Sequence, residues 1–229
     1  MARTKTQKPE ETTTTELATE QDNPAGLTGE WGNEDCDTPR LQVVAKTSDL
    51  VDEGFDPGAV ILSKEVTVAL KDKPIDIIVV NMDKRFKSDV PFGGEEEAVI
   101  FKTLAEAVAA GYSTEWESKN RVRPMSDMTM LIKAPKGTSK EDLDGYFPYK
   151  NGKDHWAMCI MTAQKTAFKS AASPVVTYLR TSGAEILGMG FTLHSTLKSG
   201  NGNSWFNPIV KRGALLDAKT KAFVAGILG

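Results

Sequence analysis

Residues 191–212 read FTLHSTLKSGNGNSWFNPIVKR, a stretch that alternates, turns and continues as a second extended segment. Apolar and polar side chains alternate from Phe191 to Lys198, which is the two-residue period of a half-buried β-strand. Gly200-Asn-Gly-Asn203 is a strong turn signal, and residues 204–211 supply the returning strand. Pro208 cannot donate a ladder hydrogen bond, so this strand is expected at a sheet edge or a bulge. The stretch therefore predicts a long β-hairpin.

Most of the other apolar runs also predict strands. Residues 75–82 (IDIIVVNM) are rich in β-branched side chains, and we expect them to form a hairpin with residues 58–70. The turn of that hairpin would be Lys71–Pro74. Further strands are expected at 41–44, 128–133 and 156–163, and a polar loop at 135–154.

Three short helices complete the predicted elements. Glu95, Glu96 and Glu97 suit a helix N-terminus and Gly111 suits the residue after its end, which predicts a helix over 95–110. Ser173-Pro174 predicts the start of a second helix that stops at Gly183, and a third is expected over 214–228. The pattern is α+β and predominantly β. An OB-like small barrel or a curved antiparallel sheet with about three helices fits it best.

The first 40 residues differ from the rest of the chain. They carry four Lys or Arg against nine Asp or Glu, include the run Thr12–Thr15, and hold few large apolar side chains. Such a composition cannot bury enough apolar surface to offset the entropy of ordering. We therefore expect residues 1–38 to be a disordered acidic tail, and residues 39–229 to form one OB-like nucleic-acid-binding domain.

The sequence carries no recognisable catalytic or metal motif. His155 and Cys159 are four residues apart, but on the expected strand that spacing is about 13 Å, too far for two ligands of one metal ion. Gly188-Met-Gly190 lacks the third glycine of a dinucleotide-binding loop. We therefore expect neither an enzyme nor a cofactor or metal. The chain also lacks the roughly 18 consecutive apolar residues of a membrane span, and its two cysteines fit the reducing cytoplasm.

Charge is distributed unevenly along the chain. Residues 155–229 carry eight Lys or Arg against two acidic residues, while residues 41–154 carry 16 basic and 20 acidic residues. The net charge of −3 therefore hides a basic final third. Binding of single strands combines cations that follow the phosphates with aromatic rings that stack on bases. The candidate phosphate ligands are Lys84, Arg85, Lys165, Lys198, Lys211 and Arg212, and the candidate stacking rings are Trp205, Phe191 and Tyr149.

The final third also resembles a known kind of protein. Its features follow one another in an order similar to that in small replication-region proteins of tailed bacteriophages. That order is Trp156, Lys165-Thr166, the helix with Val175 and Leu179, Phe191-Thr-Leu, the Gly-Asn turn, Ser204-Trp205 and a last helix. Those proteins look like OB-fold single-stranded DNA-binding proteins. The resemblance implies a non-catalytic role in phage DNA replication or recombination, with single-stranded DNA and replication or recombination proteins as partners. The better-known members of that group carry an acidic carboxy-terminal tail that recruits partners. In this chain the acidic segment is amino-terminal instead.

Two other classes of function stay open at this point. A virion structural protein or adaptor without nucleic-acid binding would use the acidic Thr/Glu-rich segment as a docking arm, and an enzyme of unknown class would need a site that no motif indicates. Self-association into a homo-oligomer is compatible with either binding function.

Overall fold

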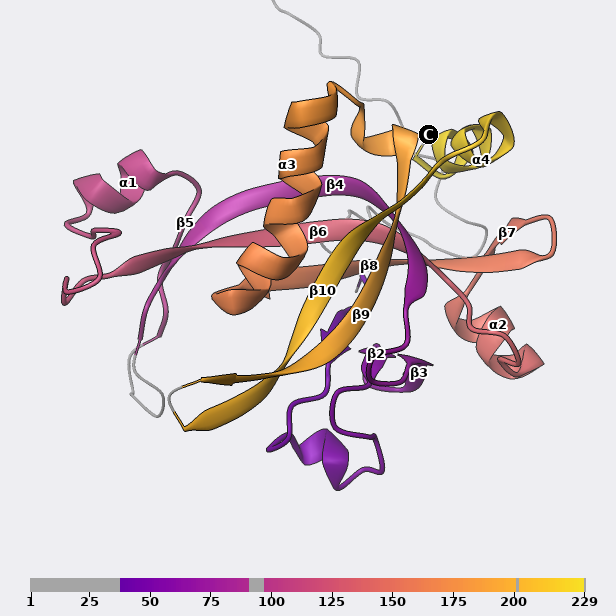
Figure 1. The fold of residues 1–229 in the computed structure, drawn as a ribbon, viewed down its shortest axis with the longest axis horizontal. Helices are drawn as coiled ribbons and strands as arrows, with labels where there is room; N and C mark the ends of the chain where they lie inside the picture. The colour runs from indigo at the N-terminus through magenta and orange to yellow at the C-terminus, as the bar shows by residue number, and fades with distance from the viewer. Residues whose placement is uncertain (1–37, 91–96, 201, 229) are drawn as a thin grey trace, which may run out of the picture. The chain divides into compact units, whose positions relative to one another are not determined.

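A curved antiparallel sheet of seven strands forms the centre of the computed structural model (Figure 1). The structure describes residues 38–90, 97–200 and 202–228. The strand order is β10-β9-β4-β6-β8-β7, and β5 pairs with β4. The strands are β4 (Ile75–Ser88), β5 (Ile100–Phe101), β6 (Val122–Lys133), β7 (Tyr149–Asn151), β8 (Asp154–Gln164), β9 (Met189–Gly200) and β10 (Asn203–Leu215).

The predicted hairpin at residues 191–212 is confirmed and is longer than expected. Strands β9 and β10 pair from Asn203–Gly200 to Leu215–Met189, and β10 lies at the edge of the sheet, as Pro208 requires. The second predicted hairpin is wrong. Residues 58–70 form their own hairpin, while β4 pairs with β6 and β9.

That separate hairpin belongs to a small three-stranded sheet. Its order is β1 (Leu41–Val43), β2 (Val60–Leu62) and β3 (Val66–Ala69), all antiparallel. Ser63 and Lys64 turn the chain between β2 and β3 with positive φ angles of 53° and 63°. This tight turn returns the chain onto β2 before it reaches residues 71–74.

The main hydrophobic core lies between one face of the large sheet, the small sheet and a helix. Alternation within β4 sends Ile77 and Val79 into this core and Ile78 and Val80 to the opposite face. The π-helical turn η3 (Phe168–Ala172) and helix α3 (Ser173–Ser182) cover the core. On the opposite face, Ile78 and Val80 pack with Trp156 and with helix α4 (Ala218–Leu228).

The helix expected over 95–110 is largely replaced by other structure. Residues 95 and 96 lie outside the described residues, Ile100 and Phe101 form β5, and only Leu104–Ala109 is helical as α1. Thr103 starts the helix because its side chain accepts a hydrogen bond from the N–H of Glu106. Ala107 is buried, whereas Leu104 and Val108 are exposed.

Other boundaries differ in smaller ways. The expected loop 135–154 contains helix α2 (Lys140–Tyr146) and β7. Ser173 is not an N-cap, because the helix continues from η3 and Ser173 already has helical angles. Two short 3-10 turns, η2 (Asp49–Val51) and η4 (Ile186–Gly188), link neighbouring elements.

The α+β, predominantly β fold class is confirmed. The sheet is curved and antiparallel and does not close into a barrel, and the described residues hold four α-helices rather than three. Within the described ranges, no helix combines the length and the apolar character that crossing a membrane requires.

Candidate nucleic-acid interface

The two-stranded ribbon β9–β10 brings three of the predicted site residues to one face. Lys198 pairs directly with Trp205, and Lys211 pairs with Thr192. Because side chains alternate along each strand, Lys198, Trp205, His194 and Lys211 point to the same side of the ribbon. Trp205 and Lys211 are six residues apart, so this row extends over about 20 Å. The ribbon therefore places these side chains on one face.

The ribbon carries positive charge without acidic neighbours in its own strands. No Asp or Glu occurs between Met189 and Leu215. Lys198, Lys211 and Arg212 are exposed, and within the described residues none of them belongs to an ion pair. Lys198 and Lys211 are therefore available to an external anion, whereas the Arg212 guanidinium lies over the Tyr178 ring.

Lys46 lies near the tip of the ribbon, on the side of Ser204 and opposite to Lys198 and Trp205. Its Nζ donates a hydrogen bond of 2.6 Å to Oγ of Ser204, 158 residues away in the sequence. Sequence reasoning missed Lys46, because only the tertiary fold brings its loop to β10.

Trp205 lies across the end of the hairpin. It is half-buried, and a Cβ atom at Gly200 would meet ring atom Cη2 of Trp205 at 3.3 Å. The indole Nε1 is buried and has no hydrogen-bond partner among the described residues. The absence of a side chain at residue 200 leaves room for this ring, which stays partly open to solvent.

Phe191 is not a stacking residue, and this corrects the sequence prediction. It is only 3% exposed and belongs to the main core, where its ring meets that of Tyr178 edge-on at 6.3 Å between centroids. Its β10 partner Arg212 lies on the same side of the ribbon, opposite to Lys211. Arg212 therefore approaches α3 and not the row of Lys198 and Lys211.

Tyr149 is also separated from the ribbon. It lies in β7 at the opposite edge of the sheet, where it packs beside Trp156 and Val224. The structure therefore does not bring this predicted stacking residue together with Trp205.

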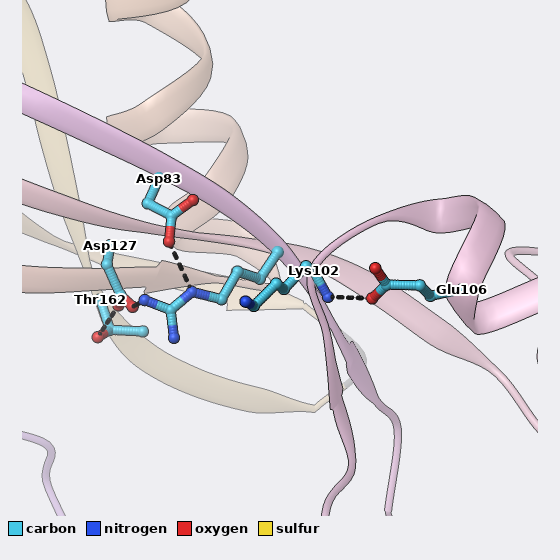
Figure 2. A network of polar contacts seen from close by, with 6 residues as sticks. Asp83, Lys102, Glu106, Asp127 and Thr162 are labelled. Atoms are coloured by element: carbon cyan, nitrogen blue, oxygen red, sulfur yellow. Dashed lines mark hydrogen bonds and ion pairs between the residues drawn. The ribbon is translucent and has the colours of Figure 1, made fainter. Parts of the chain in front are cut away.

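Arg85 and Lys84 contact neighbouring side chains of β4 and β6. The Arg85 guanidinium contacts Asp83 at 2.8 Å and Asp127 at 2.9 Å, and Thr162 donates a 2.5 Å hydrogen bond to Asp127 (Figure 2). The hydrogen bond to Asp83, together with the charge of both carboxylates, raises the pKa of Arg85. Lys84 Nζ lies 5.1 Å from the centroid of the Phe86 ring. Two carboxylates already compensate Arg85, which makes it a weak candidate for phosphate binding.

Lys165, in contrast, lies beside the ribbon. It follows β8 with a φ of 54°, and the next residue, Thr166, donates a 3.0 Å hydrogen bond to Oδ1 of Asn207 in β10. Lys165 also lines a hollow of about 190 Å³ together with Lys87 and Arg123. Arg123 is paired with Asp89, so Lys87 and Lys165 are the cations of this hollow that no ion pair engages within the described residues.

His194 lies close enough to Lys211 for the two charges to interact. Burial lowers its pKa below the usual 6.5, the charge of Lys211 lowers the pKa further, and Asp72 opposes the change. A phosphate beside Lys211 would oppose this effect and raise the pKa of His194.

The described residues contain no cluster of metal-ligating side chains. No group of three or more His, Cys, Asp or Glu side chains among them could hold a metal ion. Cys159 is fully buried in β8, and burial raises the pKa of its thiol far above the usual value, which disfavours the reactive thiolate. The other cysteine, Cys36, lies outside the described residues. Comparisons of the chain with protein-family models, curated proteins and solved structures found no match.

Proposed function

We propose that this protein binds single-stranded DNA through the β9–β10 ribbon and is not an enzyme. One observation carries the proposal: Lys198, Lys211 and the half-buried Trp205 share one face of a ribbon that contains no acidic residue. Phosphates of a strand would lie along the lysines, and a base would stack on Trp205. The resemblance to phage replication proteins supports a role in phage DNA replication or recombination in the cytoplasm of the host cell.

The ribbon suits a single strand because its binding elements are a row and not a shaped pocket. Lys198 and Lys211 are separated by about the length of three nucleotides of extended strand, and Lys165 lies beside β10 on the chain that follows β8. Base stacking does not depend on sequence, since every base has a flat face. We therefore expect binding with little preference for sequence at Trp205.

The test is fluorescence anisotropy of a labelled oligo-dT over a series of salt concentrations. Each phosphate neutralised on a single strand contributes about 0.7 to the slope of log affinity against log salt. The double variant Lys198→Ala/Lys211→Ala should lower that slope by about 1.4. The matched control is Lys136→Ala/Lys140→Ala, which removes one exposed lysine at the start of α2 and one in the turn before it, and should leave the slope unchanged. Absence of salt-dependent binding by the native protein would rule the proposal out.

One observation favours the alternative of an interaction protein. Five large apolar side chains are exposed within residues 97–121, around β5 and α1: Val99, Ile100, Leu104, Val108 and Trp116. Exposed apolar patches mark surfaces that contact other proteins. Size-exclusion chromatography that shows a large homo-oligomer indifferent to oligo-dT would favour an assembly role over DNA binding.

A further inference from the structure

A hollow at the junction of β1, β8 and β10 lies next to the ribbon. Arg40, just before β1, forms a parallel bridge with Ile160 of β8, and the N–H of Ile160 donates a 2.9 Å hydrogen bond to the carbonyl of Pro39. Strand β1 also contacts β10. The hollow between these strands has a volume of about 310 Å³ and is open on one side. Ligand sites in proteins usually have about 300–1,000 Å³, so this volume suits one ring-sized group.

The aromatic wall of the hollow is Phe206. It follows Trp205 in β10 and therefore points to the opposite side of the strand. The Phe206 ring lies directly over Gly58, and this contact holds the ring in place. A Cβ at residue 58 would be only 2.6 Å from the ring. The ammonium of Lys71 lies 5.9 Å from the ring centroid. Phe206 is half-buried and lines the hollow, so its ring can stack on a flat group placed there.

The polar wall of the hollow is Gln42. Its amide nitrogen Nε2 is buried and has no hydrogen-bond partner within the described residues. Buried polar atoms are nearly always paired in native proteins, and an unpaired donor needs an explanation. Because Gln42 lines the hollow, a turn of its amide would present this donor to an acceptor atom on a ligand.

The charge around the hollow favours an anionic chain over a neutral small molecule. Arg40 lines the hollow, is exposed, and in the described part of the chain makes no ion pair. Thr166, beside Lys165, is hydrogen-bonded to Asn207, the residue that follows Phe206. Cations therefore lie near an aromatic ring and an unpaired amide, which matches the phosphate and base of one nucleotide.

We propose that this hollow takes one unpaired base of the bound strand. The base stacks on Phe206, Gln42 Nε2 donates to an exocyclic carbonyl oxygen of the base, and Arg40 binds the adjoining phosphate. Thymine, uracil, guanine and cytosine carry such an oxygen, and adenine does not. The hollow therefore favours oligo-dT over oligo-dA. This inference rests on the proposed function and adds to it a position at which the strand is read.

Two substitutions test the hollow without changing the charge of the protein. Phe206→Leu should weaken binding to oligo-dT about tenfold because one stacked base is lost. Its salt slope should stay unchanged, because no phosphate contact is removed. Gln42→Met keeps the length of the side chain and removes the donor, so it should reduce the ratio of dT to dA affinity. The matched control, Gln164→Met, makes the same change at an exposed glutamine at the end of β8 and should keep the ratio.

The outcomes separate this inference from the proposed function. If the native protein does not bind oligo-dT, the proposed function fails. If it binds with a normal salt slope but Phe206→Leu and Gln42→Met behave like the native protein, the hollow is not a base site and the ribbon proposal stands. A second test is photocrosslinking of the native protein to an oligonucleotide that contains 5-iodo-deoxyuridine. Its result does not depend on whether a variant folds. Crosslinks to Phe206 or to β1 support the inference, and crosslinks confined to other segments overturn it.

Discussion

The guanidinium of Arg212 lies over the ring of Tyr178, with its central carbon 4.6 Å from the ring centroid. This contact joins the edge strand β10 to helix α3 on the core side of the ribbon. The preceding residue, Lys211, points to the opposite side, toward His194. Two adjacent cations of the sequence thus have different environments, and their substitution should have different effects.

Substitution of Arg212 by alanine should lower the free energy of unfolding by about 0.5–1 kcal/mol, because an exposed cation–π contact contributes about that much. Lys211→Ala should change it by less than about 0.5 kcal/mol, since Lys211 is exposed and makes no ion pair within the described residues. Urea denaturation measures both. In a double-mutant cycle with Tyr178→Leu, purely additive losses would contradict the contact.

Glycine 58 should be far more sensitive to substitution than Gly54. Both residues have positive φ angles, 88° and 98°, so alanine strains the backbone at either site. At Gly58 the new Cβ would also meet the Phe206 ring at 2.6 Å, whereas at Gly54 it would meet nothing within 4 Å. Gly58→Ala should therefore lose about 1–3 kcal/mol more stability than Gly54→Ala. Equal losses of unfolding free energy for the two variants in chemical denaturation would show that the Phe206 ring moves aside without destabilising the protein.

The strands of the large sheet were predictable because their signals are local. Alternation and the turn at residues 200–203 are sufficient to indicate β9–β10, and the apolar runs indicate β4, β6 and β8. The partners of β4 were not predictable, because β6 and β9 are far away in the sequence and a nearer partner was present at residues 58–70. The length of helix α1 was overestimated because the glutamates at residues 95–97 and Gly111 do not reveal that Ile100 and Phe101 pair with β4.

The candidate site was predictable to a similar degree. The two-residue period places Lys198, Trp205 and Lys211 on one face, and the same period assigns Phe191 to the face with Leu193, which is buried. Arg85 could not be assessed from the sequence, because one of its two carboxylates, Asp127, comes from another strand. Gln42 and Arg40 gave no local signal, since their place beside Phe206 depends on where β1 lies in the tertiary structure.

Asn207 should be important for the stability of β10. Its side chain is 4% exposed, accepts a hydrogen bond from Thr166 and donates one of 2.7 Å to Ser170, whose hydroxyl bonds to the Pro208 carbonyl at 2.7 Å. Asn207→Ala removes the hydrogen bonds of Asn207 to Thr166 and to Ser170. It should lower the free energy of unfolding by about 1–3 kcal/mol. Asn203→Ala, at an exposed position of the same strand, is the control and should have little effect. Similar values for the two variants in urea denaturation would show that the buried bonds are not needed.

His194 should make stability and binding depend on pH. Its pKa lies below 6.5 in the folded state because of burial and then of Lys211. The unfolded chain therefore binds a proton more readily, so the contribution of His194 to stability is complete above about pH 6.5 and is lost as the pH falls through the folded-state pKa. His194→Gln should remove this part of the acid sensitivity.

The pKa itself can be followed by NMR titration of the His194 ring proton. Lys211→Ala should raise the pKa, because one of its two lowering influences is removed. Oligo-dT should also raise the pKa, because phosphates at Lys211 bring negative charge near the imidazole. Proton uptake then accompanies binding, and affinity should increase as the pH falls toward the pKa of the free protein. A pKa that does not respond to oligo-dT, in a sample where anisotropy shows saturation, would place the bound strand away from Lys211 and His194.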